Sequence, residues 1–417
     1  MTNTNPSTPA VLSEAQIREI IFDGLPPESF KGKRILALTP DTTRTCPLPQ
    51  IIGLLNQILA PSCERLDFMV ALGTHTPLSR EKLLDLYGIE ASEAETRFPK
   101  SSFFNHRWDL PESFRSIGMI DKNDIERISG GELNESLPVE INKAVFDYDE
   151  LLILGPVFPH EVVGFSGGYK YLFPGISGGA FLHFFHWLGA VLTCKRIIGV
   201  KDTPVRDLIN KAMALVPIPT RCLAMVVNPD ETLCGLFAGD TQNVWSQAAD
   251  LSAGTHIRYR DRSYNTVLGI APEMYDEIWT GGKVMYKLEQ MVAPGGRLII
   301  YAPHIREISR TWGKDIEAIG YHTKDYFLAR MERFEGIPKG VLAHSTHVKG
   351  TGSYKDGVET PDVQVILATS IPEDTCERIN LGYLDPGTIN PDEFRKREEE
   401  GILVVDHAGE ILYKLAT

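Results

Sequence analysis

The sequence lacks the cysteine spacing and the positive charge that mark several protein classes. Its six cysteines, spread over 417 residues, form no C-x-x-C pair and no short metal-type spacing, which argues against a disulfide framework or a local zinc motif. Buried thiols in a reducing compartment are the simplest interpretation. With 42 basic and 55 acidic residues the net charge is −13, so the composition disfavours a sequence-independent nucleic-acid binder, whose affinity comes from clustered Lys and Arg.

Long apolar runs are also missing. The longest nearly apolar stretch, Gly179–Leu192, contains two histidines and falls short of the ~20 residues needed to span a bilayer. The first ten residues are polar and lack the basic and apolar regions of a signal peptide. Because 43% of the residues are hydrophobic and 23% are charged, the chain is expected to be a cytoplasmic globular protein with no membrane and no nucleic-acid partner.

Short aliphatic runs separated by helix-length segments predict an α/β protein with largely parallel sheets. The length predicts two or three domains, and the polar segment 254–263 divides two series of runs. We therefore expect an α/β domain over 1–260 and a second over 261–417, with the last residues packing back on the first. The end of the chain, 403–413, predicts a hairpin that turns at Ala408 and Gly409. The expected strands are 34–38, 66–72, 151–154, 222–227, 266–270, 297–301 and 363–367.

Ligands in open α/β sheets gather at the loops that follow the carboxyl ends of strands, so those loops are the first places to look for chemistry. Asp41 and Arg44 follow the first expected strand, in a turn bounded by prolines, and Arg44 is suited to gripping a carboxylate or phosphate. His75 follows the second strand on a glycine turn, where it is placed for proton transfer. The structural alternatives are an Asp that caps the next helix and a histidine that only packs.

The densest segment follows the strand at 151–154. It is rich in glycine between Gly164 and Gly179 and also carries His160, Ser166 and Lys170. Backbone N–H groups in such a loop can form an anion-binding nest, to which a lysine adds charge. The loop matches neither the P-loop nor the Rossmann fingerprint, which favours an unusual cofactor over ATP or NAD.

Two histidines three residues apart, His183 and His186, then share an expected helix face and could ligate a metal. Aromatic core packing with satisfied histidines is the alternative, because H-x-x-H without a third local ligand is weak evidence.

Together these residues resemble the nickel-pincer-nucleotide-dependent lactate racemase family. The resemblance rests on Asp41-Thr-Thr-Arg44, on Ala71-Leu-Gly-Thr-His75, and above all on the block from His160 to Lys170 followed by His186. It covers most of the first ~260 residues in order and spacing. Members of the family interconvert stereoisomers at C2 of 2-hydroxy acids. The active site is expected in the cleft between the two domains.

The resemblance implies a role for each matching residue. Lys170 would attach the nickel-pincer nucleotide covalently, and His186 would be the protein ligand to nickel. His75 and His160 would be the acid/base pair, one on each face of the substrate, while Arg44 would bind the substrate carboxylate. Asp41 would orient neighbouring groups around the cofactor. The phosphate of the cofactor would lie against Ser166, Gly167 and Gly168.

This assignment agrees with the chemistry of a 2-hydroxy acid. Its C2 proton is only weakly acidic, so hydride transfer to an electrophilic cofactor, through a planar 2-keto acid, is an easier route to inversion. One histidine takes the hydroxyl proton as hydride leaves, and the second serves the other enantiomer.

The second domain departs from the family pattern. Gly281-Gly282 is followed by Tyr286, Lys287 and Gln290, with the amide and the lysine exchanged, and a segment with His344, His347 and Lys349 replaces an expected aromatic wall. We expect substrate binding by five residues of this domain, which are Tyr286, Lys287, Gln290, His347 and Lys349. Such a polar pocket suggests a substrate larger and more hydroxylated than lactate, although His344 and His347 could instead be surface loop residues.

Two other functions stay open at this stage. The chain could be a zinc- or iron-dependent lyase or hydrolase with His183 and His186 as ligands, or a non-catalytic protein that binds a nickel cofactor. The expected partners are a small 2-hydroxy acid and the proteins that make and insert the cofactor.

Overall fold

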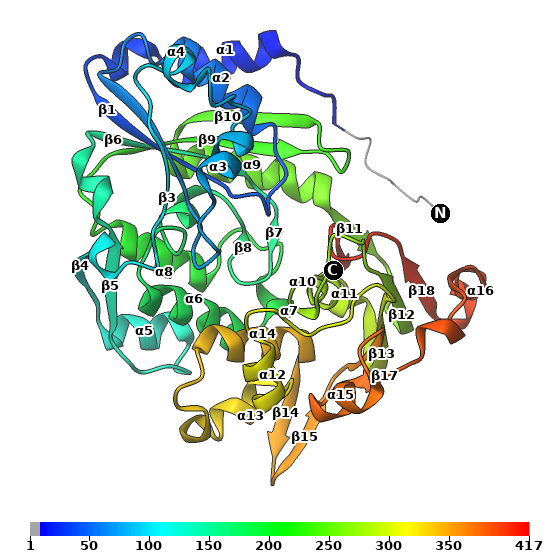
Figure 1. The fold of residues 1–417 in the computed structure, drawn as a ribbon. Coiled ribbons are helices and arrows are strands. Elements are labelled where there is room, and N and C mark those ends of the chain that lie inside the picture. Colours follow the sequence, from blue (N-terminus) through cyan, green and yellow to red (C-terminus); the bar gives the residue numbers. More distant parts are fainter. Residues whose placement is uncertain (1–8, 417) are drawn as a thin grey trace. The chain divides into compact units, whose positions relative to one another are not determined.

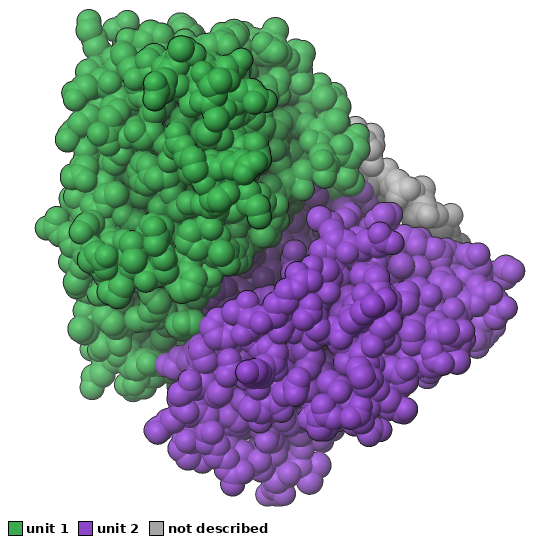
Figure 2. All heavy atoms as spheres, in the orientation of Figure 1, with its two compact units in different colours: residues 1–158, 165–185, 201–255 green, residues 159–164, 186–200, 256–417 purple. Residues whose placement is uncertain are grey.

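The computed structural model describes residues 9–416 and separates into two compact units. Unit 1 holds residues up to 158 together with 165–185 and 201–255, and unit 2 holds 159–164, 186–200 and the chain from 256 onward. Figure 2 colours the two units separately. The division at 255/256 lies within the expected boundary segment, but the units are not contiguous in sequence as the expected domains were. Two short pieces of the first half of the chain belong to unit 2.

A six-stranded sheet forms the centre of unit 1 (Figure 1). Its strand order is β10-β9-β6-β1-β2-β3, and every neighbouring pair is parallel except β9 with β10. The strands are β1 (Arg34–Thr39), β2 (Arg65–Val70), β3 (Phe103–Asn105), β6 (Glu150–Pro156), β9 (Thr220–Val227) and β10 (Leu233–Asp240). A separate antiparallel pair is formed by β4 (Phe114–Ile120) and β5 (Leu137–Asn142). The predicted α/β class is confirmed here.

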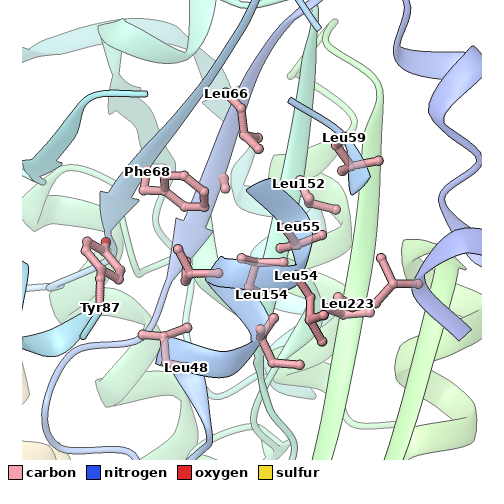
Figure 3. Close-up of a cluster of buried hydrophobic side chains, with 14 of the residues drawn as sticks. Leu48, Leu54, Leu55, Leu59, Leu66, Phe68, Tyr87, Leu152, Leu154 and Leu223 are labelled. Carbon is pink, nitrogen blue, oxygen red and sulfur yellow. The ribbon is translucent and has the colours of Figure 1, made fainter. Parts of the chain in front are cut away.

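Helices of unit 1 bury their apolar residues against this sheet. Figure 3 shows Leu54 and Leu55 of α2 packed with Leu152 and Leu154 of β6, a cluster built from the continuous aliphatic runs that predicted buried strands. The helices are α1 (Glu14–Gly24), α2 (Leu48–Ile58), α3 (Arg80–Leu86), α4 (Ala94–Arg97), α5 (Lys122–Ser129), α8 (Pro204–Met213) and α9 (Thr241–His256), and α6 (Gly179–Leu192) begins in this unit. No helix among residues 9–416 is long and apolar enough to cross a membrane.

Unit 2 is built on a second, fully parallel sheet of order β17-β16-β13-β12-β18. Its strands are β12 (Tyr264–Ile270), β13 (Val292–Ala302), β16 (Gln364–Thr369), β17 (Gly382–Tyr383) and β18 (Ile402–Val405). Smaller pairs are β14 (Gly352–Lys355) with β15 (Val358–Pro361) and β11 (Ile257–Arg260) with β19 (Leu412–Leu415). The helices are α7 (Cys194–Ile197), α10 (Ile278–Gly281), α11 (Lys283–Leu288), α12 (Gly313–Ile319), α13 (Lys324–Leu328), α14 (Lys339–Lys349), α15 (Glu373–Arg378) and α16 (Pro391–Arg395).

The predicted C-terminal hairpin is wrong. Strand β18 pairs in parallel with β12, whereas β19 pairs in parallel with β11 in a different sheet. Each half of the 403–413 segment has β-forming residues. Instead of pairing with each other, the two halves pair with β12 and β11. The final residues pack on β11, which the sequence analysis placed in the first domain and which belongs to unit 2.

Candidate functional site

Three loops of unit 1 that carry candidate site residues follow three strands that are direct neighbours. Strand β1 pairs with β2 on one side and with β6 on the other, all in parallel. The segments that carry Asp41, His75 and Lys170 leave the carboxyl ends of β1, β2 and β6. Because parallel neighbours end at the same edge of a sheet, the topology brings these loops together.

Asp41 and His75 form a hydrogen-bonded pair. The Asp41 Oδ2 to His75 Nδ1 distance is 2.5 Å, and Thr43 donates to Asp41 Oδ1 from its backbone N at 3.0 Å and from Oγ1 at 2.6 Å. Burial alone would raise the pKa of Asp41, but the hydrogen bonds from His75 and Thr43 lower it to about 2. Asp41 is therefore a carboxylate that orients His75, whose side chain is 58% exposed.

Arg44 offers a cation beside this pair. Its backbone N donates to Asp41 O at 3.3 Å, and the side chain is half-buried. Within residues 9–416 Arg44 forms no ion pair with a carboxylate. A guanidinium in that state is suited to bind a carboxylate brought by a ligand.

The glycine-rich loop is held mainly by its own hydrogen bonds. Ser166 is buried, and its hydroxyl accepts from Phe158 N at 2.9 Å and donates to Pro156 O at 3.1 Å. The amide of Ser166 donates to Phe158 O. The Ser166 hydroxyl and amide thus face inward, and contacts of Ser166, Gly167 and Gly168 with a cofactor phosphate stay a prediction.

Gly167 and Gly168 are needed for the path of this loop. Their φ angles are +80° and +58°, in the region that favours glycine. A Cβ on Gly167 would lie 2.7 Å from the Val157 side chain, and one on Gly168 would lie 3.0 Å from the Trp245 ring. The backbone therefore approaches its neighbours more closely than any other residue would allow.

Lys170 lies on a short 3₁₀ turn, Gly168–Tyr171, and is half-buried. Its Nζ is 5.9 Å from the centre of the Phe185 ring. The carbonyl of Lys170 accepts from Gly175 N at 3.1 Å, and the carbonyl of Gly175 accepts from Gly73 N at 2.9 Å. Two backbone hydrogen bonds thus connect the lysine loop to the turn that carries His75.

His160 belongs to unit 2, on the short strand β7 (Pro159–His160). It is buried, and its Nδ1 accepts from Val162 N at 3.1 Å. Glu161 Oε2 lies 3.5 Å from the same nitrogen. An Nδ1 that accepts a backbone N–H carries no proton, so the neutral ring has its proton on Nε2.

His183 and His186 lie one turn apart on α6, and both are half-buried. Burial lowers the pKa of His183, whose Nδ1 is buried with no hydrogen-bond partner. The part of the chain that the structure describes contains no group of three His, Cys, Asp or Glu side chains arranged to hold a metal ion. Within the described residues, side chains alone therefore do not complete a metal site around His183 and His186.

Residues of α11 and of the 3₁₀ turn that follows it, Glu289–Met291, are engaged in hydrogen bonds in unit 2. Buried Lys287 donates from Nζ to Pro159 O at 2.6 Å, directly before His160. Gln290 donates to Lys195 O at 3.0 Å, and a 2.9 Å bond joins Tyr286 Oη with His344 Nδ1. Their predicted contacts with a substrate are untested, whereas Lys287 clearly supports the strand that carries His160.

Replacing Lys287 with Met should loosen this support. Loss of a buried charge-assisted hydrogen bond is expected to lower the free energy of unfolding by ~1–3 kcal/mol, read from urea denaturation of the apoprotein. Gln290→Met, which removes an exposed hydrogen bond, should cost less than ~0.5 kcal/mol. Equal losses in the two variants would contradict a special role for Lys287.

The surface-loop interpretation of His344 and His347 is wrong, because both are buried on α14. Burial lowers the pKa of His344 to about 3 and that of His347 to about 4, so both rings are neutral at pH 7. Both ring nitrogens of His347 lack a partner, and the ring lines a cavity of about 40 Å³ together with Cys194 and Glu289. Lys349 donates from Nζ to Asn380 O at 2.5 Å.

Sequence reasoning missed several residues that shape the site. Glu161 stands beside the ring of His160, and Arg206 and Trp245 bind the backbone of the glycine-rich loop. Glu161 was inside the quoted motif and could have been noticed as a charged neighbour. Arg206 and Trp245 carry no local signal, because they reach the loop from helices 39 to 79 positions further along the chain.

Comparison with known proteins agrees with the geometry. Residues 26–196 match the model of the lactate racemase N-terminal domain. The chain is 26% identical over 225 residues to lactate racemase of Lactiplantibacillus plantarum, covering 52% of this chain and 47% of that protein. It is 30% identical over 149 residues to lactate racemase of Thermoanaerobacterium thermosaccharolyticum, covering 35% of this chain and 30% of that protein. The matches thus span about half or less of these curated relatives.

Solved structures extend the similarity over the whole fold. A structural-genomics crystal structure from Thermotoga maritima has a TM-score of 0.85 and 31% identity, covering 99% of this chain and 100% of that chain. The lactate racemase apoprotein from Thermoanaerobacterium thermosaccharolyticum has a TM-score of 0.73 at 16% identity, covering 98% of this chain and 95% of that chain, and shows the same fold. Residues 26–196 of this chain therefore form an N-terminal domain of the lactate racemase family, and the chain as a whole has the fold of the lactate racemase apoprotein.

Proposed function

We propose that this protein is a racemase or epimerase that inverts C2 of a 2-hydroxy carboxylic acid, using a nickel-pincer nucleotide attached at Lys170. The observation that carries the proposal is the Asp41–His75 pair, placed beside Arg44 and hydrogen-bonded through Gly73 and Gly175 to the loop of Lys170. These are the groups that proton transfer, carboxylate binding and covalent attachment require, and they occupy one edge of one sheet.

The residues present fit such a cofactor. Lys170 provides a half-buried primary amine next to the Phe185 ring, and His186 provides one imidazole, so sulfur and carbon donors of the nucleotide would complete the nickel coordination. When bound, the group supplies the hydride acceptor that the side chains of the protein cannot provide. The remaining work, which is binding and proton transfer, falls to the chain itself.

His75 is set up as a base. Because its Nδ1–H donates to the Asp41 carboxylate, Nε2 keeps its lone pair and can take the hydroxyl proton of a substrate. Asp41 also stabilises the imidazolium that results, since its low pKa keeps it ionised. Arg44, on the same loop as Asp41, would hold the carboxylate of that substrate.

His160 is set up differently. With Nδ1 accepting from Val162 N, its neutral ring presents a protonated Nε2. A proton taken up at Nδ1 would break that bond and would be stabilised by Glu161, 3.5 Å away. The two histidines thus start in opposite tautomers, which suits a pair in which one gives a proton while the other takes one.

The substrate is proposed to be larger and more polar than lactate. In unit 2 the buried imidazole of His347 has two unpartnered nitrogens and lines a cavity of about 40 Å³, which supports recognition of a hydroxyl group. Tyr286, Lys287, Gln290 and Lys349 complete the proposed substrate-binding set of this unit. A polar substrate group would satisfy nitrogens that an apolar methyl group would leave unpaired.

Cofactor-loaded protein tests the proposal. Protein produced together with the cofactor-making proteins should show an adduct on Lys170 by intact-mass and peptide analysis, with one nickel bound per chain. Incubation with a panel of 2-hydroxy acids in deuterated water, read by chiral chromatography, should show inversion of at least one of them. An unmodified Lys170 under these conditions contradicts the proposal.

Two other results would each support one of the alternatives. Zinc or iron retained without the cofactor pathway and lost in His183→Ala would point to a metal-dependent lyase or hydrolase. A tight adduct with no inversion anywhere in the panel would point to a non-catalytic cofactor-binding protein.

The Asp41–His75 pair should also make stability depend on pH. The pKa of Asp41 falls from 3.8 to about 2 on folding, so the pair contributes up to about 2 kcal/mol that is present above pH 4 and lost as the pH falls through 2. The free energy of unfolding of Asp41→Asn should therefore lie below that of the wild type at pH 7, and the gap should narrow toward pH 3. Asp23→Asn, at an exposed position of α1, serves as the control, and a gap between Asp41→Asn and the wild type that stays constant with pH would contradict the pairing.

A further inference from the structure

A buried arginine lies directly behind the glycine-rich loop. Arg206 is in the first turn of α8, where its backbone N donates to the Thr203 hydroxyl at 3.1 Å. Its side chain is 3% exposed. Nη2 donates to Phe165 O at 2.5 Å, and Nη1 donates to Gly167 O at 3.3 Å.

Trp245 of α9 binds the carbonyl of Ser166, the residue between Phe165 and Gly167. Its Nε1 donates to Ser166 O at 2.8 Å, and Arg206 Cζ lies 4.1 Å from the centre of its ring. Three successive carbonyls, those of residues 165, 166 and 167, are therefore bound by one stacked pair of side chains. Stacking of guanidinium on indole also fixes the two donors relative to each other.

The charge of Arg206 makes this arrangement unusual. Within residues 9–416 it forms no ion pair with a carboxylate, and its buried Nε has no partner. Burial lowers its pKa to about 9, so it stays protonated at neutral pH. Burying a cation without a counter-ion costs free energy, and a residue that only filled space would be better as Leu or Met.

Arg206 and Lys170 donate to the same carbonyl oxygen. Gly167 O accepts both from Arg206 Nη1 and from Lys170 N, each at 3.3 Å. From Lys170 the hydrogen bonds continue through Gly175 to Gly73, two residues before His75. Fixing Gly167 therefore fixes the start of the turn that carries the lysine.

We propose that Arg206, together with Trp245, is a positioning residue that holds the 165–170 loop so that Lys170 is presented in one orientation for cofactor attachment. The attachment part rests on the proposed function, whereas the ordering of the loop does not. The hydrogen bonds of the pair to the loop go to backbone carbonyls, and the pair is not itself catalytic.

Hydrogen–deuterium exchange of the apoprotein tests the ordering. In Trp245→Phe and Arg206→Met we expect peptides over 164–175 to exchange at least about tenfold faster than in the wild type, because the loop loses one or two hydrogen bonds. Peptides over β1 and β2 should be unchanged in Trp245→Phe, which keeps an aromatic ring and so protects the fold. Arg221→Met is the matched control, since Arg221 also lies over an aromatic ring, 5.2 Å from Phe30, in the same unit.

Cofactor loading gives the second measurement. The fraction of chains with an adduct on Lys170 should fall at least severalfold in both variants and stay near the wild-type value in Arg221→Met. Uniformly faster exchange over all of unit 1, or an unchanged loop, would overturn the proposal in favour of a purely structural arginine. A wild type without any adduct would refute the proposed function, while the exchange data would still decide whether Arg206 orders the loop.

Discussion

Lys170→Ala is expected to abolish racemisation. Without the amine there is no covalent attachment, and because the side chains of the protein offer no hydride acceptor, the rate should drop by more than ~10⁴-fold, to the background of the assay. Chiral chromatography of the best substrate measures the rate, and intact mass should show the unmodified chain. Lys170→Arg keeps the positive charge and should be equally inactive.

A matched lysine controls for general damage. Lys201, in the same unit, pairs with Asp250 and Ser246 and takes no part in the proposed site. Lys201→Ala should keep its adduct, its nickel and nearly all activity. Substantial racemisation by Lys170→Ala would show that the nucleotide acts without this bond, or that the chemistry is different.

Single replacements of the two proposed acid/base histidines are expected to separate the two directions of the reaction. His75→Gln and His160→Gln should each slow full racemisation by ~10²–10⁴-fold. In a single turnover, followed by the 2-keto acid released from each pure enantiomer, His75→Gln should fail with one enantiomer and His160→Gln with the other. The physical reason for this division is that the two rings would face opposite sides of the substrate, so that each takes the hydroxyl proton of one enantiomer.

His304→Gln is the control for these variants, because His304 is a half-buried histidine whose Nε2 hydrogen-bonds to a backbone carbonyl, that of Tyr275. It should behave as the wild type with both enantiomers. If both His75→Gln and His160→Gln slowed the same enantiomer, the two-base assignment would fail and one histidine would have only a supporting role.

Continuous aliphatic runs predicted the central strands well. The runs at 34–38, 151–154 and 222–227 are the interiors of β1, β6 and β9, because a parallel strand covered on both faces needs apolar residues at every position. The hairpin at 403–413 failed for the converse reason. Strand pairing is decided by neighbours far away in sequence, which a local pattern cannot contain.

Candidate site residues could be predicted where polar side chains directly follow an expected strand. Asp41 and His75 were recognised by their place after β1 and β2, but their direct bond needed the register of that sheet. The sequence analysis recognised His347 as a polar residue. It did not predict that His347 is buried, because helix α14 shows no clear amphipathic pattern. Arg206 could not be found at all, since its partners are backbone carbonyls.

The discontinuity of unit 2 has a consequence for recombination among relatives. Residues 159–164 and 186–200 pack with the chain beyond 256 through bonds such as Lys287 to Pro159 and Gln290 to Lys195. In a chimera joined at 255/256, the residues after 256 would come from a relative, whereas 159–164 and 186–200 would still come from this chain. Bonds such as those of Lys287 and Gln290 would then join segments of different origin. Exchange of unit 2 between relatives therefore calls for three transplanted segments, one of which brings His160 and another His186 with it.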